Sequence, residues 1–98
     1  MITLTYFGHS CFLIEGRKGK VVIDPFFKGN PHVRVNPAEI LCNAVLVTHG
    51  HQDHFGDAIE IATKNHAPVI GVYELVQHCI KQGTGGHGMN IGGSFHFD

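Results

Sequence analysis

Three histidines and one aspartate lie within six consecutive positions, in the order His-Gly-His-Gln-Asp-His. The strand-like run Ala44–Thr48 comes directly before them, and a helical pattern follows. Alternate residues of an extended backbone face the same side, so His49 and His51 can present two imidazoles to one point. Asp53 and His54, at the start of the helix, can aim at a second point nearby. Imidazole and carboxylate ligands suit zinc, manganese, iron or nickel, so this spacing predicts a site for two metal ions.

A simpler interpretation exists for each of these residues taken alone. One histidine near a helix start is usually solvated, and Asp53 could be an N-cap that accepts backbone hydrogen bonds. Three clustered imidazoles are harder to explain in this way, because they repel one another when protonated. They also serve no packing purpose that leucine would not serve better. Metal ligation is therefore the interpretation that the cluster favours.

Hydrophobic patterning predicts the elements that must position this cluster. The first two strands should form a hairpin, and the later β-α-β-α order favours parallel strands with right-handed crossovers. The third strand ends at Asp24, and residues 26–40 should form a long surface loop in which residues 37–40 make one helical turn. The fold class is α/β, a mixed sheet with its helices packed on one face. The expected strands are 1–7, 10–15, 20–24, 44–48, 68–72 and an alternating run at 94–98, with helices from about 54 to 65 and 74 to 82.

Composition limits the partners of the chain. Seven Lys+Arg against eight Asp+Glu give a net charge of −1, which does not support a surface that neutralises nucleic-acid phosphates. The apolar runs are far shorter than the roughly 20 residues that span a bilayer. The N-terminus lacks a basic segment followed by an apolar stretch, so we expect a cytoplasmic protein. The cysteines form no C-x-x-C pair and are expected to be buried thiols of a reducing compartment; they are Cys11, Cys42 and Cys79.

The run Thr48–Asp57 resembles the H-x-H-x-D-H signature of the metallo-β-lactamase superfamily. Residues 6–15, 22–26 and 90–93 are similar to its UPF0173-like branch, bacterial and archaeal metal-dependent hydrolases related to lactonases that act on sugar phosphates. The resemblance covers essentially all 98 residues. It implies that the chain is the N-terminal half of an αβ/βα sandwich, a hydrolase domain whose C-terminal half is absent here.

The resemblance also implies a role for each candidate residue. It assigns His49 and His51 to one metal ion, and Asp53 and His54 to the other. Asp53 would be catalytic as well, because it would steer the bridging hydroxide. Asp24 would brace the ligand loop without touching a metal ion.

His9 lies in the turn of the first hairpin, where the residues alone indicate no more than a turn. The resemblance implies that it faces the substrate pocket. The family has three further ligands, a histidine, a metal-bridging aspartate and a last histidine, which come after the point where this sequence stops. His9, His87, His96 or Asp98 could complete a site from within the chain, although nothing in their spacing demands it.

These observations favour an enzyme, a metal-dependent hydrolase in which metal-bound hydroxide attacks an ester, lactone or phosphoester of a small molecule. Zinc is the preferred identity of the two divalent ions, with manganese, iron and nickel as alternatives. A metal-binding or assembly module without catalysis of its own stays open, as does a nuclease of the same superfamily, which the net charge disfavours. Because parallel strands are normally covered on both faces, we expect self-association or pairing with a C-terminal half.

Overall fold

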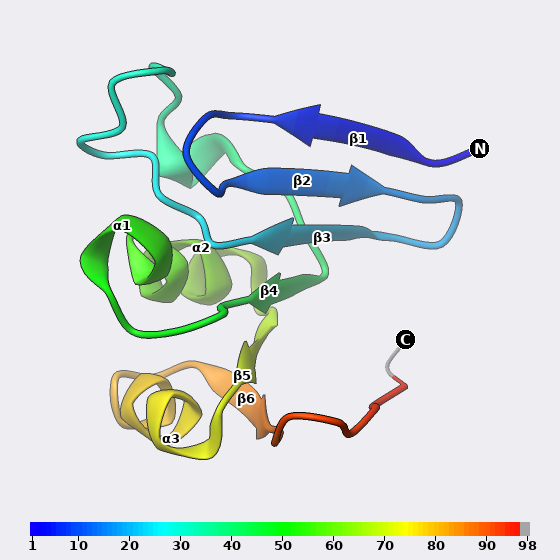
Figure 1. Ribbon diagram of the computed structural model, residues 1–98, viewed down its shortest axis with the longest axis vertical. Helices are drawn as coiled ribbons and strands as arrows, with labels where there is room; N and C mark the ends of the chain where they lie inside the picture. Colours follow the sequence, from blue (N-terminus) through cyan, green and yellow to red (C-terminus); the bar gives the residue numbers. More distant parts are fainter. Residues whose placement is uncertain (97–98) are drawn as a thin grey trace.

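A six-stranded mixed sheet forms the centre of the structure, and its strand order follows the sequence (Figure 1). This computed structural model describes residues 1–96. The first three strands pair antiparallel, and the last three extend the sheet in parallel from the third. The strands are β1 (Thr3–Tyr6), β2 (Phe12–Glu15), β3 (Lys20–Ile23), β4 (Ala44–Leu46), β5 (Pro68–Gly71) and β6 (Gly85–Gly88).

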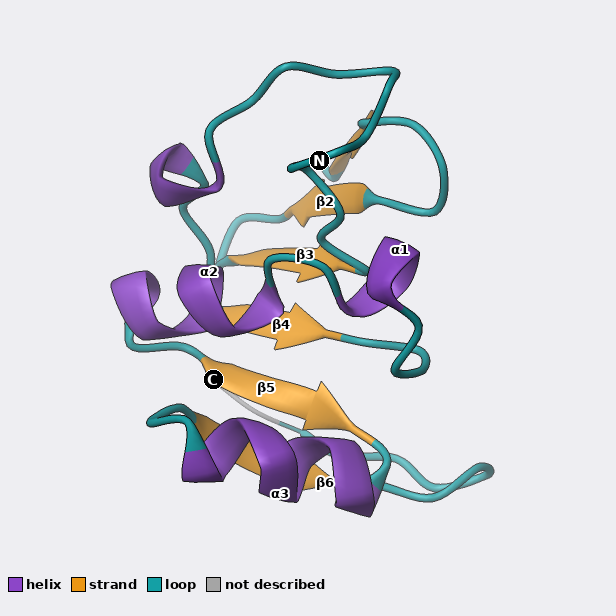
Figure 2. Ribbon diagram, turned by 90° about the vertical axis from the view of Figure 1, so that its left-hand side faces the viewer, coloured by secondary structure: helices purple, strands orange, loops and turns teal. Residues whose placement is uncertain are grey.

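Residues 1–96 contain three α-helices, and they lie on one side of this sheet (Figure 2). The second helix packs on β4 and β5, and the third packs on β5 and β6. The expected α/β architecture, a mixed sheet with helices on one face, is thereby confirmed. The helices are α1 (Gln52–Phe55), α2 (Ala58–Asn65) and α3 (Tyr73–Lys81), with a single 3-10 turn, η1 (Pro37–Glu39), before β4.

A row of branched apolar side chains joins the sheet to the helices. Leu13, Val22, Val45 and Val69 are register partners across β2 to β5. The three valines are fully buried, and they belong to one core cluster that also contains Ile61 of α2. β-branched residues favour the strand conformation, so the same side chains that specify these strands also fill the core.

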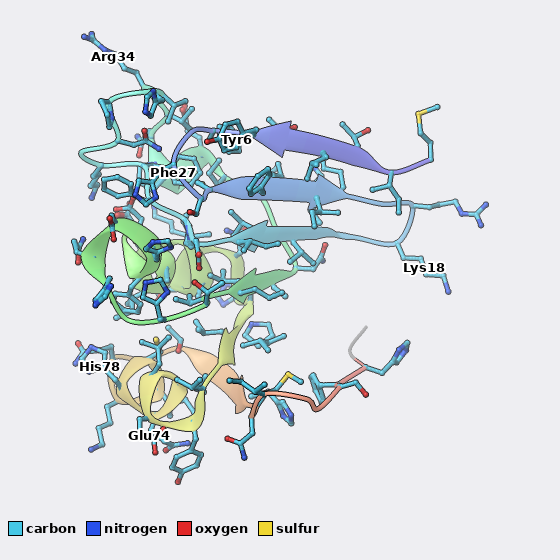
Figure 3. The ribbon with its side chains drawn as sticks, in the orientation of Figure 1. Tyr6, Lys18, Phe27, Arg34, Glu74 and His78 are labelled. Carbon is cyan, nitrogen blue, oxygen red and sulfur yellow. The ribbon has the colours of Figure 1, made fainter. Side chains whose placement is uncertain are left out.

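The opposite face of the sheet carries apolar side chains that no helix covers. Tyr6, Phe12, Ile23 and Leu46 are register partners across β1 to β4, and none belongs to the core cluster. The ring centroids of Tyr6 and Phe12 lie 4.8 Å apart, and Tyr6 is 59% exposed at the end of β1 (Figure 3). We call these four residues the open face.

The helix expected from about 54 to 65 is wrong in one respect, because two helices replace it. The break falls at Gly56, which has a φ of 39°. A Cβ atom there would lie 2.7 Å from the carbonyl oxygen of Pro25, so the backbone passes too close to the loop after β3 for any side chain. Glycine at this position therefore lets α1 turn toward the end of β3.

The glycine-rich tail forms a strand that the sequence pattern did not predict. β6 pairs in parallel with β5, and a Cβ atom at Gly86 would lie 2.5 Å from Cγ1 of Val76 in α3. Because glycine has low strand propensity, only this close packing reveals the element. The strand expected at 94–98 is wrong for residues 94–96, which are not in a strand, and residues 97–98 lie outside the described chain.

The loop expected over residues 26–40 is present, and η1 confirms the helical turn within it. The loop is not purely a surface segment, because Phe27 is only 3% exposed and packs edge-on against Phe7 at 5.1 Å. Asn30 is also buried, and its side-chain amide donates hydrogen bonds to the carbonyl oxygens of Phe7 and Phe26. This loop is therefore fixed beside the carboxyl ends of β1 and β3.

Among the residues described, no helix is long and apolar enough to cross a membrane.

Candidate metal centre

The histidine-rich run lies at the carboxyl end of β4, where the chain turns into α1 (Figure 1). His51 caps α1 with an extended backbone, and Asp53 and His54 follow inside the helix. The carboxyl ends of parallel strands are the usual place for a site in an α/β sheet, because loops from neighbouring strands meet there.

Four imidazole rings lie side by side at this edge. The ring centroid of His49 lies 4.7 Å from that of His51 and 4.1 Å from that of His54. The ring of His9 comes from the turn between β1 and β2 and lies 4.9 Å from His54. The structure thus brings the three histidines of the run together and adds His9 to them.

Asp24 is the buried carboxylate beneath these rings, and it is only 2% exposed. Its Oδ1 accepts a hydrogen bond from the backbone N–H of Thr48 at 2.7 Å. Its Oδ2 accepts one from the Thr48 hydroxyl at 2.7 Å and lies 2.9 Å from Nδ1 of His54. The φ of Asp24 is 46°, a left-handed conformation that costs a non-glycine residue on the order of 1 kcal/mol. The surrounding structure therefore overcomes backbone strain to hold this carboxylate in place.

The hydrogen bonds around Asp24 determine where two imidazoles carry their protons. A carboxylate only accepts, so Nδ1 of His54 donates to Asp24, and in the neutral imidazole Nε2 then has a free lone pair. The single hydroxyl proton of Thr48 goes to Asp24, so the Thr48 oxygen accepts from Nδ1 of His49 at 2.9 Å. In their neutral forms both rings therefore offer Nε2 as the unprotonated nitrogen, which is the atom that can bind a metal ion.

Asp53 lies on the solvent side of the rings, and its side chain is 49% exposed. Its Oδ2 is 3.1 Å from Nε2 of His9, and its Oδ1 is 3.7 Å from Nε2 of His54. These three residues each offer a ligand atom, and the three atoms lie within 4.8 Å of one another. Two imidazoles and a carboxylate form a donor set that fits zinc and similar divalent ions.

The other residues that could complete a site do not join this group in the described part of the chain. The ring of His87, on β6, stacks on Phe95 with a centroid distance of 3.6 Å. His96 is not part of the group of donors, and Asp98 lies outside the described residues.

Two further residues of this region were not identified from the sequence. Thr48 links Asp24 to His49 through its hydroxyl group. The only signal in the sequence was its position directly before the histidine run. Asp57 is buried, and its Oδ2 accepts hydrogen bonds from the backbone N–H groups of Phe27 and Lys28 at 2.8 and 3.0 Å. Asp57 therefore fixes the loop after β3 against the start of α2.

The cysteines are free and buried, which confirms the prediction of core thiols. Burial raises the pKa of Cys11 to about 11 and has the same effect on the pKa of Cys42. Burial also raises the pKa of Cys79. These shifts disfavour the thiolate form, so burial activates none of the three as a nucleophile.

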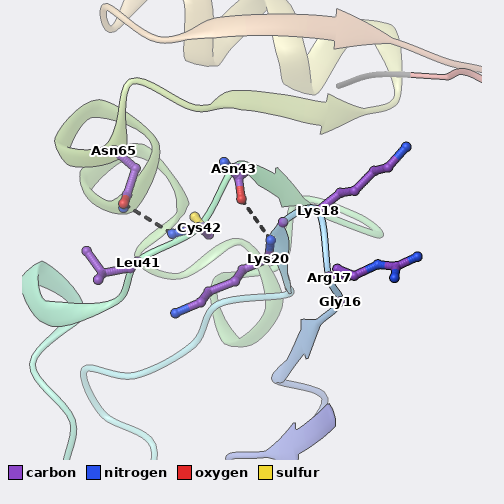
Figure 4. Close-up of a pocket in the computed structure, with 9 residues that line it drawn as sticks. Gly16, Arg17, Lys18, Lys20, Leu41, Cys42, Asn43 and Asn65 are labelled. Atoms are coloured by element: carbon purple, nitrogen blue, oxygen red, sulfur yellow. Dashed lines mark hydrogen bonds between the residues drawn. The ribbon is translucent and has the colours of Figure 1, made fainter. Parts of the chain in front are cut away.

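A separate surface cavity of about 430 Å³ lies between the β2–β3 turn and the segment before β4 (Figure 4). Arg17 and Lys18 contribute to its lining, and the Asn43 side chain accepts a hydrogen bond from the Lys20 backbone at 2.8 Å. This cavity is at the amino ends of β3 and β4, the ends opposite the histidine cluster. It is therefore not part of the candidate metal centre.

Comparison with known proteins identifies the family. A family model described as the beta-lactamase superfamily domain matches residues 3–94. A solved structure titled Igni18, a metallo hydrolase from Ignicoccus hospitalis, superposes with a TM-score of 0.82 at 36% identity and covers 94% of this chain and 41% of that one. The chain therefore belongs to the β-lactamase superfamily and has the fold of its metal-dependent hydrolases.

Similar sequences carry the name UPF0173 metal-dependent hydrolase. The protein of Pelotomaculum thermopropionicum is 52% identical over 95 residues, which cover 97% of this chain and 41% of that protein. The protein of Archaeoglobus fulgidus is 48% identical over 91 residues, which cover 93% and 39% of the two chains. The chain thus spans about two fifths of the length of these curated relatives.

We expect Asp24→Ala to weaken Zn²⁺ binding by about 10- to 100-fold, as is typical when a group that orients metal ligands is lost. The variant removes the acceptor that holds His54 and Thr48. It does not remove any of the Nε2 atoms that would bind the metal ion. Isothermal titration calorimetry on folded protein measures the effect. Glu39→Ala is the control, because it removes an exposed carboxylate in the turn η1 that precedes β4, outside the histidine cluster. An unchanged titration for Asp24→Ala would show that Asp24 only ends a strand.

Proposed function

We propose that this chain is the N-terminal half of a metal-dependent hydrolase with a binuclear centre. The substrate would be a small molecule that contains an ester, lactone or phosphoester bond. The observation that carries the proposal is the group of imidazoles and one carboxylate at the end of β4, two of whose rings are held with Nε2 free. Zinc is the ion that we propose, and manganese, iron and nickel suit the same donors.

In this proposal the residues of the site have distinct tasks. His49 and His51 hold one ion, and Asp53 and His54 hold the other. When bound, the ions polarise the scissile bond and make water a nucleophile at neutral pH. The Asp53 carboxylate orients that water, and Asp24 keeps His54 aligned through the contact at Nδ1. His9 borders the space in which a substrate would lie.

The motif alone supplies two ligands for each ion, whereas a catalytic zinc typically has three protein ligands and an open position. We propose that a C-terminal half, of the kind that the longer relatives have room for, supplies further ligands and covers the open face. The match covers 41% of the length of the Pelotomaculum protein, so the rest of that protein is longer than this chain.

We also propose that the protein is cytoplasmic, because its three cysteines are free and buried.

The incomplete ligand set also favours a second candidate function. A metal-binding or assembly module needs only ligands and a docking surface, and the H-x-H-x-D-H run offers two candidate ligands per ion beside a sheet face on which Tyr6 is exposed. The two candidates differ in turnover, which the activity experiment below measures.

The open face predicts that the 98-residue chain associates in solution. Tyr6, Phe12, Ile23 and Leu46 would otherwise leave contiguous apolar surface in water, which soluble monomers avoid. Sedimentation velocity should show a species larger than a monomer, and Ile23→Lys should shift it toward the monomer. Leu41→Lys is the control, because Leu41 is an exposed apolar residue away from the sheet. A strictly monomeric and cooperatively folded chain would contradict the prediction.

The activity test compares the chain alone with the same residues joined to the C-terminal part of the Pelotomaculum relative. With added Zn²⁺, the chain alone should hydrolyse ester and phosphodiester substrates little better than free metal does, and the joined protein should turn over. In the joined protein, Asp53→Asn keeps the shape but loses the charge that holds an ion and orients water. A displacement of about 1 Å can cost on the order of 100-fold in rate, so kcat/KM should fall at least that far.

Cys79→Ser is the control in this experiment, because Cys79 lies in the core and should affect stability without changing the rate per folded molecule. Metal binding without turnover by the joined protein would favour the assembly module. Rapid turnover by the short chain would show that neither the ion assigned to His49 and His51 nor the substrate needs groups from a C-terminal half.

A further inference from the structure

His9 lies outside the histidine-rich run but reaches the same cluster from the turn between β1 and β2. We propose that His9 is a metal ligand, and that His9, Asp53 and His54 form a three-donor site contained entirely within this chain. The inference rests on the proposed metal-dependent function, and it adds a ligand that the H-x-H-x-D-H spacing does not supply.

The distances support a shared ion rather than a simple hydrogen-bonded pair. Nε2 of His9 lies 3.1 Å from one carboxylate oxygen of Asp53, and Nε2 of His54 lies 3.7 Å from the other. All three donor atoms lie within 4.8 Å of one another. The 3.7 Å separation is too long for a hydrogen bond, so the carboxylate faces two nitrogen atoms but bonds closely with only one.

The orientation of His54 strengthens this argument. Its Nδ1 donates to the Asp24 carboxylate at 2.9 Å, so in the neutral imidazole the Nε2 that faces Asp53 presents a lone pair. That nitrogen and the Asp53 carboxylate then face each other as two acceptors, 3.7 Å apart. A divalent cation between them resolves this arrangement, because it accepts both lone pairs.

The backbone of His9 is held in place by its surroundings. Gly8 and His9 both have left-handed φ values, 95° and 55°. A Cβ atom at Gly8 would lie 2.4 Å from Cβ of His32, so the turn is packed closely against the loop after β3. The Tyr6 hydroxyl donates to the carbonyl oxygen of His9 at 2.7 Å, and the Phe26 ring meets the imidazole edge-on at 5.7 Å. The imidazole is therefore oriented before any ion binds, which reduces the entropy lost on ligation.

Three protein ligands of this type match a catalytic zinc site, which uses three and keeps one position open. The side chain of His9 is about one third exposed and that of Asp53 about half, so an ion can enter from solvent. The same exposure leaves a coordination position open. His9 would thus give the ion held by Asp53 and His54 its third ligand.

The test is metal binding by the full 98-residue chain, with Zn²⁺ followed by calorimetry and Co²⁺ by its visible absorption. His9→Asn removes the imidazole, and asparagine tolerates the left-handed backbone better than other non-glycine residues. The matched control is His66→Asn, because His66 is exposed, has a φ of 52° and caps the far end of α2. Circular dichroism confirms that each variant is folded before the titration.

We expect His9→Asn to lower the affinity at this site at least about 10-fold and to change the Co²⁺ spectrum, while His66→Asn binds as the unmodified chain does. Equal affinities and equal spectra for the two variants would overturn the assignment of His9 and leave the proposed function standing. If the unmodified chain bound neither ion, both the assignment and the metal-dependent function of this chain would be overturned. If His9→Asn proves unfolded, histidine NMR of the unmodified chain decides: Zn²⁺ must shift the His9 Nε2 resonance, and its failure to do so overturns the assignment.

Discussion

The buried carboxylate of Asp24 is the group on which the arrangement of the site depends. Removing an ionised carboxylate from water is costly unless hydrogen-bond donors replace the solvent. Thr48 supplies two donors and His54 a third. These hydrogen bonds connect Asp24, at the end of β3, to the residues after β4 and to α1. Its backbone N–H also donates to the carbonyl oxygen of Leu46 at 2.8 Å, which continues the β3–β4 pairing to the edge of the sheet. One residue therefore connects the sheet to the histidine-rich run.

The chain accepts local strain around this carboxylate. Among the described residues, three that are not glycine have a positive φ. Two of them lie at the candidate site: His9 is one of the clustered histidines, and Asp24 contacts His54. Such conformations persist only where the surrounding structure enforces them, and they concentrate at functional sites. Here Asp57 fixes the loop after β3, and close packing of Gly56 on Pro25 directs α1 toward it. The core valines and these close contacts together provide the rigid frame that the site needs.

Local pattern was sufficient for the elements whose side chains fill the core. Val22, Val45 and Val69 sit in short β-branched runs, and the spacing from 49 to 54 identified the histidines whose rings lie together at the end of β4. The pattern failed where backbone packing decides, as at Gly86 in β6 and at the Gly56 break. The proximity of His9 to His54 could not be predicted from residue spacing, because the two residues are 45 positions apart in the sequence. They meet only because the β1–β2 turn lies at the same edge of the sheet as α1. The link from Thr48 to Asp24 likewise arises only when two strands lie side by side.

Asp24 and Thr48 orient His49 and His54 with Nε2 free before any metal binds. Two-bond ¹H–¹⁵N NMR of the histidine rings in the metal-free chain tests this directly, in buffer alkaline enough for the imidazoles to be neutral. The account predicts that both rings carry their proton on Nδ1, and that Asp24→Ala releases His54 to a mixture of tautomers. A proton on Nε2 of His54 in the unmodified chain would contradict the account, because that nitrogen could then not be held ready for a metal ion.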